Sequence, residues 1–191
     1  LLSFVKKIKL NTLGLQEPFR HHKKIKAKLL NLINNSSSER DVRKDAYYGD
    51  SITKYDWNIA TDFNREWVQY IKPYLQEQFD KFSRALNHGS PLIKKVWFQQ
   101  YNKDDYHGWH IHGDNYTGVY YLDFPRGSTP TELIEQGSLN KITIKAKEGD
   151  ILIFPAFIIH RSPRIVKDIQ KTIISFNIEM YSVNSSIFPK I

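Results

Sequence analysis

The 191-residue chain contains no cysteine, and this absence removes several kinds of chemistry at once. Disulfide bonds, thiolate zinc sites and cysteine nucleophiles are all excluded. The opening residues Leu1 to Lys7 form too short and too charged a stretch for a signal peptide or a membrane span. No internal repeat and no linker divides the chain. We therefore expect one cytoplasmic domain over residues 1–191, without a membrane partner.

Acidic residues are outnumbered, with 20 Asp and Glu against 28 Lys and Arg, which gives a formal net charge of +8. A basic surface supplies affinity for phosphates, so a nucleic-acid partner is one interpretation. The alternative is a solvated basic face together with attraction for a dianionic cosubstrate. We favour the alternative, because no recognised nucleic-acid-binding motif accompanies the charge.

Residues 1–90 are expected to form a mainly helical support. A partly alternating segment within residues 1–15 suggests an edge strand. Pro18 suits the first turn of a helix. The other face of this helix is strongly basic, which we interpret as its solvated side rather than a partner surface. The residues expected to be buried follow the spacing of an amphipathic helix: Ile25, Leu29, Leu32 and Ile33.

A polar loop over residues 34–38 separates this helix from a second one. Thr61 or Asp62 can cap the second helix, and Glu66 would lie in its first turn. Pro73 should kink or divide it. Its aromatic stripe is typical of a helix that packs against the outside of a sheet.

After Pro91 the pattern changes to short alternating segments separated by turn sequences. Eight such strands predict an α+β, mainly β fold: a double-sheet jelly roll over residues 91–181, with a surface tail at 182–191. The predicted strands are 94–101, 108–112, 117–124, 131–135, 141–146, 150–154, 157–160 and 171–181.

The stretch from Tyr106 to Asp114 holds three candidate metal ligands at alternating positions, His110, His112 and Asp114. In an extended segment these side chains share one face. Imidazole and carboxylate together suit non-haem Fe(II) in a two-histidine, one-carboxylate site. A third ligand should come from a distant strand, and His160 ends an apolar, β-branched run. A lone histidine there is usually a packed residue, but its conjunction with His112-x-Asp114 favours a ligand.

Two ligand sets remain open: His112 and Asp114 with His160, or His110 and His112 with His160. We favour the first, because a carboxylate lowers the net charge on Fe(II).

At these residues the chain resembles the Fe(II)/2-oxoglutarate-dependent dioxygenases, most closely a phage-type branch related to prolyl 4-hydroxylases. The resemblance covers roughly the C-terminal half, and its specificity lies in the order and spacing of the motifs. Weaker similarity reaches Tyr55–Trp57 and Arg65–Trp67. The motifs are Val96–Tyr101, Trp109–His112, Thr117–Leu122, Phe154-Pro155, His160 and Ser175–Asn177.

The resemblance implies a double-stranded β-helix that uses Fe(II), 2-oxoglutarate and O2, with ascorbate as reductant. Such an enzyme hydroxylates an unactivated C–H bond and releases succinate and CO2. We expect a peptidyl substrate such as proline, with free amino acids or nucleobases as other targets. If the gene belongs to a phage, the location is the host cytoplasm. A different class is also open: a non-catalytic, cupin-like jelly roll that binds a metal or a sugar.

The resemblance also implies a cation for the C5 carboxylate of 2-oxoglutarate. By position this cation is Lys171, where many relatives carry arginine. Ser175 lies four residues on and would share a strand face with it. Arg164 is the competing cation, although Pro163 beside it suggests a loop.

Further candidates for holding the cosubstrate are hydrogen-bonding residues on the predicted strands. Tyr101 and Tyr121 are candidate donors, and Asn177 could assist from the face of Ser175. His88 and His107 are expected to be loop or surface residues.

Overall fold

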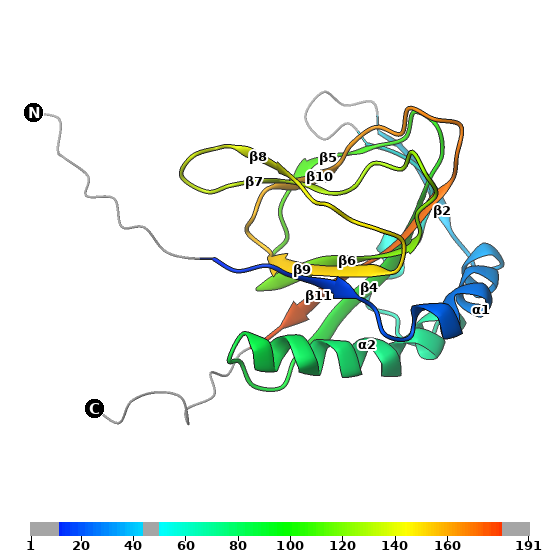
Figure 1. Ribbon diagram of the computed structural model, residues 1–191. Coiled ribbons are helices and arrows are strands. Elements are labelled where there is room, and N and C mark those ends of the chain that lie inside the picture. The colour runs from blue at the N-terminus through cyan, green and yellow to red at the C-terminus, as the bar shows by residue number, and fades with distance from the viewer. Residues whose placement is uncertain (1–11, 44–49, 181–191) are drawn as a thin grey trace, which may run out of the picture.

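The computed structural model describes residues 12–43 and 50–180 of the chain. Two antiparallel sheets face each other, and two helices cover the outer face of the larger sheet (Figure 1). The seven strands of the major sheet lie in the order β1 (Leu15–Pro18), β9 (Asp150–Pro155), β6 (Tyr116–Asp123), β11 (Lys171–Glu179), β4 (Leu92–Tyr101), β3 (Asp50–Tyr55) and β2 (Glu39–Arg43). The minor sheet has the order β5 (His107–His110), β10 (His160–Ser162), β7 (Glu132–Ile134) and β8 (Lys141–Thr143).

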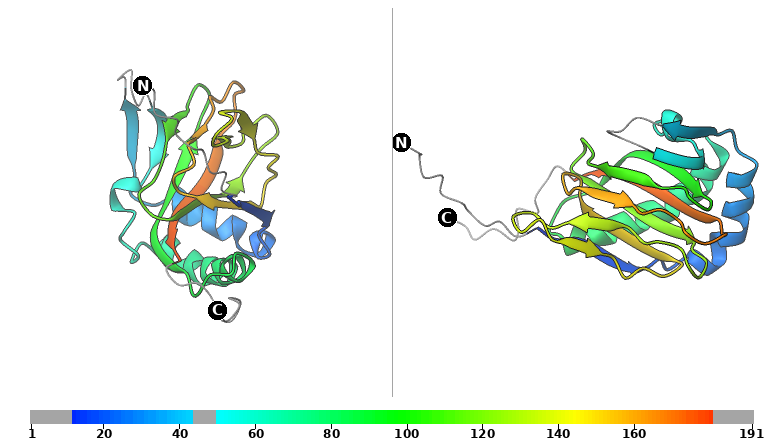
Figure 2. Two further views of the ribbon diagram at one scale, coloured as in Figure 1. Left: turned by 90° about the vertical axis from the view of Figure 1, so that its left-hand side faces the viewer. Right: turned by 90° about the horizontal axis from the view of Figure 1, so that it is seen from above.

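Two apolar clusters hold these three layers together. One lies between the major sheet and the helices α1 (His22–Asn34) and α2 (Glu66–Ala85), with Phe98 and Phe176 among its members. The other lies between the two sheets, with Val119 and Ile173 among its members. Neighbouring residues on a strand face opposite sides of the sheet, so β4 and β11 contribute alternate side chains to each cluster. Figure 2 shows the same layers from two further directions.

The helices confirm part of the sequence prediction. Ile25, Leu29 and Ile33 are fully buried on α1, as the amphipathic spacing predicts, and Leu32 packs against them while partly buried. Pro18 is not in the helix: it ends β1, where it pairs with Asp150. The chain adds an edge strand to the major sheet first, and the helix begins only at His22. None of the described helices is long and apolar enough to cross a membrane.

The second helix differs from the prediction in its cap and in the effect of its proline. Its N-cap is Arg65 rather than Thr61 or Asp62, although Glu66 does lie in the first turn. Pro73 does not divide the helix, which runs unbroken through it. Ile71 and Leu75 are fully buried on either side of Pro73, so packing against the sheet offsets the hydrogen bond that the proline cannot make.

Most predicted strands are present to within a few residues of their predicted ends. The segment 157–160 is an exception, because β10 begins only at His160. The strands β2 and β3 were not predicted, since residues 39–59 show no clear periodicity. The predicted N-terminal strand lies mostly outside the described residues, and the predicted tail 182–191 lies entirely outside them. Gly118 on β6 has no room for a side chain, because a Cβ there would lie 2.0 Å from the Leu152 carbonyl oxygen.

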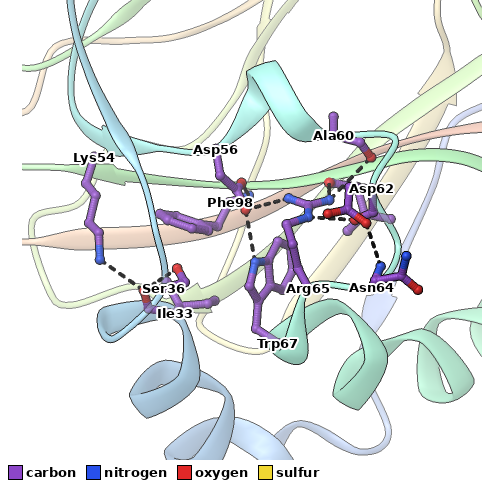
Figure 3. A network of polar contacts seen from close by, with 11 residues as sticks. Ile33, Ser36, Lys54, Asp56, Ala60, Asp62, Asn64, Arg65, Trp67 and Phe98 are labelled. Carbon is purple, nitrogen blue, oxygen red and sulfur yellow. Dashed lines mark hydrogen bonds and ion pairs between the residues drawn. The ribbon is translucent and has the colours of Figure 1, made fainter.

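A buried ionic network joins the helical support to the major sheet (Figure 3). Asp56 is 1% exposed, and its carboxylate accepts hydrogen bonds from Arg65 Nη1 (2.5 Å), Trp67 Nε1 (2.9 Å) and the Phe98 backbone N–H (2.9 Å). Burial raises the pKa of Asp56, and the Arg65 guanidinium opposes this shift.

Asp56→Ala should destabilise the protein by about 3–5 kcal/mol, because it leaves a buried guanidinium, an indole N–H and a backbone N–H without their acceptor. Urea unfolding measures this change. Asp62→Ala is the matched control: among the described residues its exposed carboxylate accepts a hydrogen bond from the Asn64 N–H alone, at 2.9 Å. We expect the control to change the free energy of unfolding by less than about 0.5 kcal/mol. Equal small effects would show that the network carries little of the stability.

Candidate metal and cosubstrate site

Three histidines from two chain segments converge at the end of the minor sheet. His110 is the last residue of β5, His112 follows two residues later, and His160 is the first residue of β10. Antiparallel pairing of β5 with β10 places His160 directly opposite His110. One ring nitrogen from each of the three lies within 4.8 Å of the others. The Nε2 atoms of His112 and His160 are 3.2 Å apart.

Backbone carbonyls fix the orientation of two of these rings. His110 donates from Nδ1 to the Gly108 carbonyl oxygen at 2.7 Å, and His160 donates from Nδ1 to the Ile158 carbonyl oxygen at 2.9 Å. With Nδ1 protonated, Nε2 of each ring keeps its lone pair for a metal ion. The local sequence produces this arrangement, because in both cases the carbonyl belongs to the residue two positions earlier.

The electrostatics of the cluster favour neutral imidazoles. Burial lowers the pKa of His110 and His160 below the ordinary histidine value. Burial, with smaller contributions from the charges of His110 and Lys95, lowers the pKa of His112 to about 3. Neutral imidazole is the form that binds a metal ion. Three neutral nitrogen donors suit a divalent transition metal such as Fe(II), so the residues present fit the metal that the resemblance implies.

Asp114 lies near this cluster but is held by a different partner. Its Oδ2 accepts a hydrogen bond of 2.5 Å from Asn177 Nδ2, and Asn177 Oδ1 accepts one of 3.0 Å from Thr117 Oγ1. The group of three that the structure brings together is His110, His112 and His160, without Asp114. The favoured set from the sequence included Asp114, so the geometry points to the other set that the sequence left open.

The histidines open onto a cavity between the two sheets. Its walls come from the inner faces of β4, β6, β9 and β11 and from the minor sheet. Trp97 lines it, and its ring lies 5.7 Å from the ring of His112. Phe154 lines it as well, 4.8 Å from the ring of His160. Both rings give the histidine end of the cavity apolar walls.

A buried lysine lies at the other end of the same sheet face. Lys171 is 1% exposed, and its Nζ donates to Ser162 Oγ at 2.6 Å and to the Thr129 carbonyl oxygen at 3.2 Å. It also lies 4.4 Å from the centre of the Tyr101 ring, its neighbour across β4 and β11. No described carboxylate forms an ion pair with it. Burial lowers the pKa of Lys171 to about 7.

The hydroxyl of Tyr101 is buried and makes no hydrogen bond of standard geometry among the described residues, with Ser162 and Gln99 as its polar neighbours. Burial raises the pKa of this phenol, so it stays protonated and can donate. A buried hydroxyl donor beside an ammonium without a carboxylate partner is the arrangement expected of a carboxylate-binding site. The positions of Lys171 and Tyr101 thus fit the roles that the resemblance implies for them.

The hydroxyl beside Lys171 comes from a residue that sequence reasoning missed. Ser175 donates to Gln99 Oε1 at 3.0 Å, four residues along β11 from Lys171. Four residues of strand span about 13 Å, so Ser175 lies toward the metal end and not beside the lysine. Ser162 takes the place expected of Ser175. The signal was present in the sequence, because Ser162 lies two residues after His160 and shares its strand face.

Of the other residues predicted to hold the cosubstrate, two are buried between the sheets and one is exposed. Tyr121 is buried, and its hydroxyl donates to Thr131 Oγ1 at 2.8 Å on the cavity wall. Asn177 is buried on the same strand face as Ser175 and binds Asp114. The Arg164 side chain is 54% exposed, and its Nη1 donates to the Asp104 carbonyl oxygen at 2.9 Å, away from the cavity.

His107 is placed differently from the expectation. It was expected to be a loop or surface residue, but it begins β5 and lines the cavity. Its ring stacks on that of His110, with centroids 3.8 Å apart, and its Nδ1 lies 3.3 Å from Gln99 Nε2. Sequence alone gives no reason to expect this, because the bulge in the pairing of β5 with β10 is what brings His107 and His110 to one face.

Residues 95–177 match the model of a family described as "Putative 2OG-Fe(II) oxygenase". The matched segment is similar to the 2OG-Fe(II) oxygenase family. It contains all three converging histidines and Lys171. No curated protein sequence matches the chain. The phage-type branch stays a prediction.

Solved structures of 2OG-Fe(II) oxygenases share the fold. A 2OG-Fe(II) oxygenase family oxidoreductase from Burkholderia pseudomallei has a TM-score of 0.71 at 14% identity, over 89% of this chain and 86% of that one. A Pseudomonas putida prolyl-4-hydroxylase has a TM-score of 0.57 at 12% identity, over 86% and 91%. The epimerase SnoN, in complex with Fe3+, alpha ketoglutarate and nogalamycin RO, has a TM-score of 0.64 at 13% identity, over 87% and 78%. The predicted jelly roll is confirmed.

Proposed function

We propose that the protein is an Fe(II)- and 2-oxoglutarate-dependent dioxygenase that hydroxylates a C–H bond of a peptidyl residue such as proline. The observation that carries the proposal is the pairing of two features in one site. Three histidine nitrogens converge at one end of the site, and a buried lysine without a carboxylate partner lies at the other. A metal ion would bind the three histidine nitrogens, and a carboxylate of 2-oxoglutarate would pair with the lysine.

In this proposal His110, His112 and His160 hold the metal through their Nε2 atoms. When bound, iron together with 2-oxoglutarate supplies O2 activation, with release of succinate and CO2. The carbonyls of Gly108 and Ile158 keep the ligating tautomers in place. Trp97 and Phe154 give the metal end of the cavity apolar walls.

Lys171 would bind the C5 carboxylate of 2-oxoglutarate. Ser162 and the Thr129 carbonyl aim its ammonium, and the buried hydroxyl of Tyr101 supplies a second donor to the same carboxylate. An ammonium is a point charge without the fork of a guanidinium, so these two neighbouring hydroxyls supply the directionality that an arginine would carry itself.

The choice of a peptidyl substrate follows from one of the structural comparisons. A prolyl-4-hydroxylase shares the fold, which supports that choice. SnoN shares the fold too and is an epimerase, so the fold alone does not determine the reaction. Free amino acids and nucleobases are the other targets. A non-catalytic, cupin-like jelly roll is the competing class, and Lys171 argues against it, because such a binder has no use for a buried, anion-free ammonium.

Binding of 2-oxoglutarate tests the proposal directly. Anaerobic addition of Fe(II) and 2-oxoglutarate to the purified protein should produce a visible charge-transfer absorption band that neither component gives alone. With O2, ascorbate and a Pro-rich peptide, succinate should form in proportion to hydroxylated peptide. A protein that binds Fe(II) but shows no affinity for 2-oxoglutarate would instead be a cupin-like binder.

A further inference from the structure

A second lysine lies on the inner face of the major sheet, at the metal end of the site. On β4, Trp97 lines the cavity, whereas Val96 and Phe98 belong to the cluster under the helices. Side chains alternate along a strand, so Lys95 shares the inner face with Trp97. Its partner across β11 is Asn177, the residue that binds Asp114.

Lys95 lies near the histidine cluster, next to Trp97 on the inner face of β4. Trp97, two residues further along β4, contacts the ring of His112. Lys95 therefore lies on the cavity face of the major sheet, one side-chain position beyond Trp97 at the histidine end.

The ammonium of Lys95 makes no ion pair and no hydrogen bond within the described part of the chain. Its neighbour Lys94 does pair, with Glu179 at 3.1 Å. The nearby carboxylate of Asp114 is bound by Asn177 instead. Lys95 is neither exposed nor fully buried, and its ammonium has no ion-pair partner among the described residues, so it can bind an anionic group from another molecule.

The cosubstrate cannot supply that anion if its C5 carboxylate lies at Lys171. Tyr101 pairs with Lys171, and Lys95 is six residues before Tyr101 on the same strand. Six residues of strand span about 20 Å, which is longer than a five-carbon diacid. The inner face of β4 and β11 thus carries two lysines without carboxylate partners, one on each side of the three histidines.

We propose that Lys95 is a specificity-determining residue that binds an anionic group, a carboxylate or a phosphate, on the molecule to be oxidised. The proposal rests on the proposed function, because it assigns Lys171 to 2-oxoglutarate and leaves Lys95 to the substrate. It narrows the substrate class to molecules with a negative charge at a fixed distance from the C–H bond that reacts.

The test uses the protein with Mn(II) in place of Fe(II) and with saturating 2-oxoglutarate. Proton NMR relaxation of a small probe reports how much of it lies near the paramagnetic ion. One pair of probes is glycyl-proline and glycyl-prolinamide, which differ in a carboxylate. The other pair is thymidine 5′-monophosphate and thymidine, which differ in a phosphate. The pair that shows a preference identifies the source of the anion.

In the unsubstituted protein, the anionic member of one pair should be relaxed at about fivefold lower concentration than its neutral partner, a preference of the size expected for one charge-assisted contact. Lys95→Met should remove the preference, and Lys95→Arg should retain it. Lys94→Met is the matched control, because Lys94 is adjacent and already paired with Glu179, and it should keep the preference.

The role of Lys95 is overturned if neither pair shows a preference, if Lys95→Met retains it, or if Lys94→Met loses it equally. The Fe(II) and 2-oxoglutarate charge-transfer band separates this failure from failure of the proposed function. A normal band in the unsubstituted protein and in Lys95→Met, with no change in probe preference, removes only Lys95. Absence of the band in the unsubstituted protein removes both proposals.

Discussion

His160→Ala should abolish metal binding and leave the fold intact. His160 supplies one of three converging nitrogen donors, and two remaining histidines hold a divalent ion far less tightly than three. We expect the dissociation constant for Mn(II) or Fe(II) to rise by at least about 100-fold, since loss of a ligand costs more than the 10–100-fold typical of an outer-shell partner. Isothermal titration calorimetry measures the change. The fold should persist, because His160 belongs to neither apolar cluster.

Asp114→Asn is the comparison that decides the ligand set. Asp114 binds Asn177 rather than joining the three histidines, so its replacement should change metal affinity by less than about threefold, below any ligand effect. His110→Ala should resemble His160→Ala. The reverse result, with Asp114→Asn losing the metal and His110→Ala retaining it, would establish the carboxylate-containing set and show that binding of the ion moves Asp114 away from Asn177.

Lys171→Met should lose affinity for 2-oxoglutarate and gain stability. The ammonium is buried without an anion, and its pKa falls from an ordinary 10.5 to about 7. Below pH 7 both the folded and the unfolded states carry the charge, so the folded state bears the full cost of burying it. Between pH 7 and 10.5 the folded lysine is neutral while the unfolded one stays protonated, so stability rises with pH. The variant should therefore be more stable than the unsubstituted protein by a few kcal/mol below pH 7, with a smaller difference at higher pH.

The same shift makes cosubstrate affinity depend on pH. The C5 carboxylate binds the charged lysine, so above pH 7 the protein must take up a proton when 2-oxoglutarate binds. The apparent dissociation constant should then rise about tenfold per pH unit above 7. Calorimetry in buffers of different ionisation enthalpy measures the proton uptake. Lys171→Arg should show no such dependence, because arginine stays charged. A flat profile in the unsubstituted protein would mean that Lys171 is charged before the cosubstrate binds.

Much of the site follows from local spacing in the sequence. His110 and His112 share a face because they are two residues apart, and the distant His160 follows an apolar strand. Lys171 and Tyr101 were predicted to bind 2-oxoglutarate, and the structure pairs them directly across β4 and β11. These features need only an alternating pattern and an order of motifs, both of which are present in the linear chain.

Other parts of the site depend on contacts between strands that are far apart in the sequence. The sequence permitted Ser175 as the hydroxyl near Lys171, but four residues of strand place it about 13 Å away, whereas the crossing strand β10 brings Ser162 within 2.6 Å of Nζ. His107 faces the cavity because of a bulge in the pairing of β5 with β10, and no residue pattern in the sequence predicts that bulge. Asp114 has the right spacing for a ligand, yet the side chain of Asn177 on β11 holds its carboxylate.

The sequence by itself determined that the chain forms a jelly roll and which two segments carry the histidines, because these depend on the period of apolar residues along single strands. Only the tertiary structure decided which hydroxyl accompanies the lysine, which histidines converge, and that two lysines without carboxylate partners lie on opposite sides of them. Those facts depend on the register between strands that are far apart in the chain, and register is fixed by packing across the whole sheet.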